Sequence, residues 1–104
     1  MPHQDGPMTE AMFYVLLALS KPNHGYQLMI EIKEISKGRI TMGPGTLYGV
    51  LTRLLKEKLI KVKEEDGRRK IYELTEQGER ALRAEYQRIK SMIKDGDFLM
   101  EDVL

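Results

Sequence analysis

The sequence predicts a mainly helical α+β fold, and three observations carry that prediction. Apolar residues recur at helical spacing in four stretches of the chain. Between the third and fourth stretches, apolar and charged residues alternate on both sides of an Asp-Gly pair, which is typical of a β-hairpin. The 104 residues suffice for one domain with a modest core. We therefore expect three helices, a hairpin and a final helix.

The first two predicted helices differ in their patterning. One runs over residues 10–19 behind the N-cap Thr9, and its apolar residues lie on every side, so both of its faces need cover. The other runs over residues 26–36 and is amphipathic. Proline and capping residue types separate the two helices, and Asn23 or His24 can cap the second one.

The third predicted helix starts near Pro44, whose fixed φ suits a first helical turn. Its inward face is rich in leucine, whereas its outward face is small, polar and basic. Gly49 on that outward face costs about 1 kcal/mol relative to alanine, which either approach to another molecule or close helix packing would explain. The outward positions are Gly45, Thr46, Tyr48, Gly49, Thr52, Arg53 and Lys56.

The predicted hairpin carries basic residues at its tip. Short strands flank residues 64–70, and glycine in the Asp66-Gly67 pair takes the positive φ of a tight turn without strain. Arg68, Arg69 and Lys70 follow that turn. The net charge of +1 hides a basic region, because residues 37–70 hold ten Lys or Arg against four acids. A locally basic surface of this kind can face an anionic partner.

The last predicted helix follows the cap Thr75, runs to about Lys94, and is closed by Asp95-Gly96. Its apolar residues are spaced four, three and four, which is typical of a coiled-coil seam. We expect this stripe and the apolar first helix to join two copies of the chain, although packing within one domain is the alternative. The predicted dimer residues are Met8, Met12, Leu16, Leu82, Tyr86, Ile89, Met92 and Ile93.

This order of elements is that of a winged helix-turn-helix, a three-helix core plus a β-hairpin wing, followed here by a C-terminal dimerisation helix. A helix about 10 to 12 Å across fits the major groove of B-DNA, about 12 Å wide. We therefore expect the third helix to read DNA while the wing reaches phosphates or the minor groove. The expected parts are a flexible tail over 1–8, the DNA-binding domain over 9–75, and the dimerisation helix and tail over 76–104.

Four stretches of the sequence resemble the PadR-like winged-helix transcriptional regulators, in the family's order and spacing. They are TEAMFYVLLAL, HGYQLMIEI, GPGTLYGVLTRLLKEKLI and DGRRKIYELTEQG. The resemblance, to the short subgroup with a single C-terminal helix, implies a cytoplasmic bacterial regulator, usually a repressor, that dimerises through that helix. Carried over by position, it implies that DNA is faced by Tyr26, Gln27, Thr46, Tyr48, Arg68, Arg69 and Lys70.

Two other functions fit parts of the same pattern. A protein-interaction module would use the basic face to meet an acidic partner. A ligand-binding dimer would hold an apolar small-molecule effector in a central crevice, since methionine makes such walls adaptable. The predicted lining is Ile89, Met92, Ile93 and Phe98. Tyr26 and Tyr48 have an alternative role as partly buried core residues.

Composition argues against catalysis. The chain has no cysteine and two histidines, which leaves too few ligands for a metal site. No lysine precedes Thr46 as a nucleotide-binding P-loop requires, and no serine lies in a nucleophile elbow. No apolar run approaches the about 20 residues of a membrane helix. We expect no enzyme, cofactor or membrane contact, but a homodimeric repressor bound to double-stranded DNA at a pseudo-palindromic operator.

Overall fold

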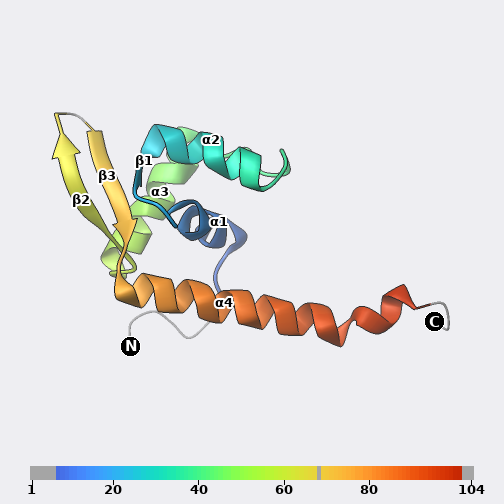
Figure 1. Cartoon of the computed structure of the whole chain (residues 1–104). Coiled ribbons are helices and arrows are strands. Elements are labelled where there is room, and N and C mark those ends of the chain that lie inside the picture. Colours follow the sequence, from blue (N-terminus) through green and yellow to red (C-terminus); the bar gives the residue numbers. More distant parts are fainter. Residues whose placement is uncertain (1–6, 68, 102–104) are drawn as a thin grey trace.

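The computed structural model describes residues 7–67 and 69–101, so predictions for the first six residues and for Arg68 lie outside the described residues. Figure 1 shows the expected order of helices and hairpin, which confirms the predicted α+β fold. The elements are α1 (Glu10–Ala18), β1 (Asn23–His24), α2 (Gly25–Ile35), α3 (Pro44–Lys56), β2 (Ile60–Asp66), β3 (Arg69–Leu74), α4 (Glu76–Asp95) and the 3₁₀ helix η1 (Asp97–Met100). Among the described helices, none combines the length and hydropathy needed to cross a membrane.

The helix starts follow from local chemistry. Thr9 Oγ1 accepts a hydrogen bond from the Met12 N–H at 3.1 Å, which confirms the predicted cap of α1. Pro44 lies in the first turn of α3, as expected. His24, one of the two expected cap positions, is the N-cap residue of α2, but its side chain makes no capping hydrogen bond. The Asn23 side chain donates instead to Glu31 Oε2 at 3.1 Å.

The sheet contains a strand that the sequence did not reveal. β1 pairs with β3, with Asn23 opposite Tyr72, so the sheet order is β1-β3-β2 and the start of α2 is fastened to the wing. The hairpin is also longer than predicted, since β2 and β3 remain paired out to Asp66 opposite Arg69. Arg69 and Lys70 therefore belong to β3 and do not lie in the turn.

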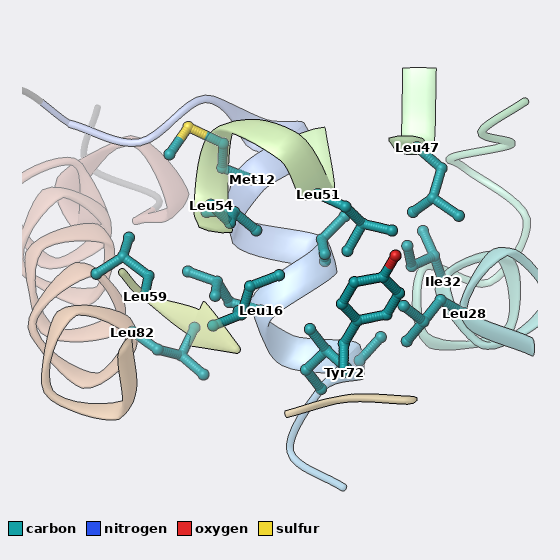
Figure 2. Close-up of a cluster of buried hydrophobic side chains, with 14 of the residues drawn as sticks. Met12, Leu16, Leu28, Ile32, Leu47, Leu51, Leu54, Leu59, Tyr72 and Leu82 are labelled. Carbon is teal, nitrogen blue, oxygen red and sulfur yellow. The ribbon is translucent and has the colours of Figure 1, made fainter. Parts of the chain in front are cut away.

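The core lies where α1, α2, α3 and the base of the wing meet (Figure 2). α1 is covered on both sides, as its all-round apolar pattern predicts. Met12 is 4%, Leu16 0% and Leu82 8% exposed, so these three side chains are already buried within one chain. This corrects their assignment to a dimer interface, because a buried side chain offers almost no surface to a second copy.

α4 extends beyond the other helices (Figure 1). Gly78, Leu82 and Glu85 in its first half are buried, whereas in its second half only Ile89 is partly buried and the other residues are exposed. Exposed apolar side chains gather on this projecting half of α4 and on η1. They are Tyr86, Met92, Ile93, Phe98, Leu99 and Met100.

Candidate nucleic-acid interface

A groove of about 510 Å³ separates the start of α2, the outer side of α3 and the wing. It brings together five residues that the sequence predicted to face DNA: Tyr26, Tyr48, Thr52, Arg69 and Lys70. It also contains five that the prediction missed: His24, Gly25, Leu51, Leu55 and Tyr72. These five come from helix starts and inward faces, where no charge or exposure signal marks them.

The outward face of α3 is set by its buried face. Leu47, Leu51 and Leu54 are each at most 1% exposed, and their helical spacing fixes the rotation of α3 about its axis. The opposite side is exposed as predicted. A Cβ added at Gly45 or Gly49 would find no heavy atom of the described chain within 4 Å, so close packing within this chain does not explain Gly49.

Two polar residues of α3 make hydrogen bonds that change their predicted roles. The Thr52 hydroxyl donates to the Tyr48 carbonyl oxygen at 2.8 Å, so its oxygen remains available as an acceptor while its hydrogen is used. Arg53 Nε donates to Glu57 Oε2 at 3.0 Å. Arg53 and Lys56 line a separate depression near the start of α4, together with Gln77, and do not line the groove.

The start of α2 contributes an exposed aromatic ring. Tyr26 is 66% exposed, which excludes the alternative that it is a core residue. Tyr48 is 47% exposed and lies across the groove from the wing bases. Gln27 is partly buried and does not line the groove, although the resemblance implied a DNA contact for it.

The wing carries both signs of charge. Lys70 Nζ lies 3.9 Å from Glu65 Oε2, and Lys61 Nζ lies 3.7 Å from Glu73 Oε2. Such exposed ion pairs contribute little, so a phosphate can displace the carboxylate. Tyr72 lines the groove from β3, and burial, followed by the neighbouring Tyr48, raises its pKa. The Tyr72 phenol is therefore neutral at physiological pH.

A buried carboxylate of α4 lies beside the segment before α1. Arg88 donates to Glu85 through two bonds of 3.0 and 2.6 Å, and the Met8 N–H also faces this carboxylate. The Arg88 hydrogen bonds hold the pKa of Glu85 below its ordinary value. Met8, Glu85 and Ile89 line a depression here, so two predicted dimer residues lie at the edge of the core.

Met92, Ile93 and Phe98, predicted to line an effector site, are each more than half exposed in the single chain.

Comparison with known proteins gives a family. The sequence model of the "Transcriptional regulator PadR-like family" matches residues 14–84. Over 89 residues the chain is 36% identical to "Transcriptional regulator YqjI" of Escherichia coli, covering 82% of this chain and 43% of that protein. It is 40% identical over 77 residues to an uncharacterized 37.1 kDa protein of a Streptomyces fradiae transposon, covering 73% of this chain and 22% of that one. The chain thus spans less than half the length of these curated relatives.

Solved structures share the arrangement. A PadR-like transcription factor from Bacteroides fragilis superposes with a TM-score of 0.72 at 27% identity, covering 85% of this chain and 87% of that one. A PadR family transcription regulator from Clostridium difficile gives a TM-score of 0.77 at 22% identity, covering 89% and 100%, and at that identity supports the fold alone. With its family match spanning most of the three helices, the wing and the start of α4, this chain belongs to the PadR-like family of transcriptional regulators.

Proposed function

We propose that this chain is a bacterial cytoplasmic repressor that binds a pseudo-palindromic operator as a homodimer, with α3 in the major groove and the wing on adjacent phosphates. One observation carries the proposal: Tyr26, Tyr48 and Thr52 line the same groove as the basic wing residues Arg69 and Lys70. Polar and aromatic groups that can meet base edges thus lie next to cations that can meet phosphates.

The projecting half of α4 supports the dimer. Tyr86, Ile89 and Ile93 continue the spacing of Leu82 beyond the body of the chain, and Ile93 is 62% exposed. An apolar stripe at coiled-coil spacing is stabilised when it packs against a second helix, and contiguous apolar patches of this kind are uncommon on monomers. A symmetric pair would present two α3 helices, as a pseudo-palindromic site requires.

The proposal predicts strong salt dependence. If a dimer neutralises roughly six to eight phosphates, log K falls with log salt at a slope of about −5 to −7, because bound counterions are released. The experiment selects duplexes from a random library with the wild-type protein and titrates the best one by anisotropy across a salt series. Failure to prefer any duplex over random DNA would remove the proposed function.

The wing is tested with a matched pair of variants. Arg69→Ala should flatten the salt slope by about 1 for each subunit, because one phosphate contact is lost. Lys94→Ala makes the same charge change at the end of α4, far along the chain from the groove, and should leave the slope unchanged. Equal slopes for Arg69→Ala and wild type would remove the wing from the DNA contact.

A further inference from the structure

Gly25 occupies a position where the backbone does not require glycine. It is the first residue of α2, it is buried, and its φ is not among the positive values found in the described chain. Glycine also loses more backbone freedom on folding than alanine does. A reason for glycine here must therefore come from the space around its α-carbon.

The ring of Tyr48 fills that space. A Cβ added at Gly25 would collide with the hydroxyl oxygen and Cζ of Tyr48, so the end of the ring lies directly over the α-carbon. Gly45 and Gly49, which precede and follow Tyr48 on α3, have open space where a Cβ would stand. Gly25 thus contacts a predicted DNA-reading side chain that comes from another helix.

Packing, and not hydrogen bonding, orients this tyrosine. Within the described residues, no hydrogen bond involves the Tyr48 hydroxyl, and the side chain is 47% exposed. Its backbone carbonyl is held by Thr52, but that bond fixes the helix and not the ring. Gly25, Tyr48 and Tyr72 of the wing line the same groove.

We propose that Gly25 is a positioning residue that sets the direction in which Tyr48 presents its ring and hydroxyl to DNA, and thereby sets sequence preference without touching a base. This inference rests on the proposed DNA-binding function. A methyl group at residue 25 would displace the Tyr48 ring or push the start of α2 away from α3. Either change moves the Tyr48 hydroxyl relative to the basic residues Arg69 and Lys70 of the wing.

A double-mutant cycle tests the coupling. The ratio of the Kd for a scrambled duplex to the Kd for the duplex selected by the wild type is measured for Gly25→Ala, Tyr48→Ala and the double variant. Gly25→Ala should lower this ratio about tenfold, the size of one lost base contact. In the Tyr48→Ala background, Gly25→Ala should lower it no further. A full additional loss in the double variant would overturn the inference.

A second measurement needs no DNA. The protein is labelled with 3-fluorotyrosine and its ¹⁹F NMR spectrum is recorded. Among the signals of the five tyrosines, that of Tyr48 is identified as the one that Tyr48→Phe removes. Gly25→Ala should shift the Tyr48 resonance and leave those of Tyr14 and Tyr86 in place. An unmoved Tyr48 resonance would overturn the inference. If the wild type selects no duplex, the proposed function fails while this spectrum still decides the position of Tyr48.

A folding defect is also informative. If Gly25→Ala unfolds the protein, the collision predicts that Gly25→Ala/Tyr48→Ala recovers the circular dichroism and melting temperature of Tyr48→Ala. Recovery supports the contact, and a double variant that remains unfolded overturns it.

Discussion

The two halves of α4 carry one continuous apolar pattern in two different surroundings. Leu82 in the first half is 8% exposed and packs into the core, whereas Ile93 in the second half is 62% exposed. The difference arises because α1 and the turn after α3 pack against α4 near its start, whereas the far end of α4 projects beyond the other helices (Figure 1). The first half therefore belongs to the fold of one chain, and the second half is free to meet another.

The first half is also anchored through its backbone. The Thr75 hydroxyl donates to the Lys58 carbonyl oxygen at 2.8 Å and accepts from the Gly78 N–H at 2.9 Å. A Cβ at Gly78 would collide with the carbonyl group of Leu59, so the first turn of α4 lies directly on the turn that follows α3. The direction of α4 is thus coupled to the end of the proposed DNA-reading helix.

The largest expected effect is at this anchor. Gly78→Ala should destabilise the protein by about 3 kcal/mol, because backbone atoms of Leu59 cannot move aside as a flexible side chain would. Urea denaturation measures the change. Ser91→Ala in the exposed second half is the control and should change stability by less than about 0.5 kcal/mol. A Gly78→Ala protein as stable as wild type would contradict the described contact.

The next effect compares two positions of the same stripe. Leu82→Ala should cost about 2 to 3 kcal/mol in the free energy of unfolding, because it leaves a cavity at the edge of the core. Ile93→Ala should cost little at protein concentrations low enough to keep the chain monomeric, because that side chain is exposed within one chain. Equal losses under those conditions would show that the second half is also part of the monomer core.

The junction between the halves should respond to pH. The pKa of Glu85 is lowered in the folded state by Arg88, so its stabilising contribution is full above the ordinary glutamate pKa and is lost as the pH falls through the lower folded value. The stability advantage of wild type over Glu85→Gln should therefore shrink on acidification. Glu76→Gln, at an exposed carboxylate, is the control. A difference that is constant between pH 7 and 3 would contradict the paired carboxylate.

The smallest expected effect concerns the turn after α3, against which the start of α4 packs. Lys58 has a φ of 63°, the left-handed conformation that closes α3, and the Leu59 N–H bonds the Leu54 carbonyl at 3.0 Å. Lys58→Gly should stabilise the protein by about 0.5 to 1 kcal/mol, because glycine adopts this φ without strain. The melting temperature measures it. A decrease would show that the Lys58 side chain contributes more than the strain costs.

Local chemistry made much of the fold predictable from sequence. The caps Thr9 and Thr75, Pro44 at the start of α3 and the Asp-Gly turn each act within a few residues. β1 was missed because its two residues are too short for alternation and pair with a strand far along the chain.

The candidate site was predictable where exposure followed helix periodicity, as on the outer face of α3. It was not predictable where contacts join separate elements. Arg53 and Lys56 line a different depression. The proposed role of Gly25 depends on its contact with Tyr48, which belongs to another helix. Met12 and Leu16 were assigned to a dimer because an all-round apolar helix does not reveal which cover comes from its own chain.

In the proposed dimer, the free half of α4 joins two copies so that two α3 helices meet one operator. Analytical ultracentrifugation of the protein with its selected duplex, wild type against Ile93→Glu, tests it most directly. The wild type should add two chains of 12.0 kDa to each duplex. Ile93→Glu should remain folded and lose at least about tenfold in affinity, because a charge enters an apolar interface. One wild-type chain for each duplex, or an Ile93→Glu protein that binds as a dimer with unchanged affinity, would contradict the account.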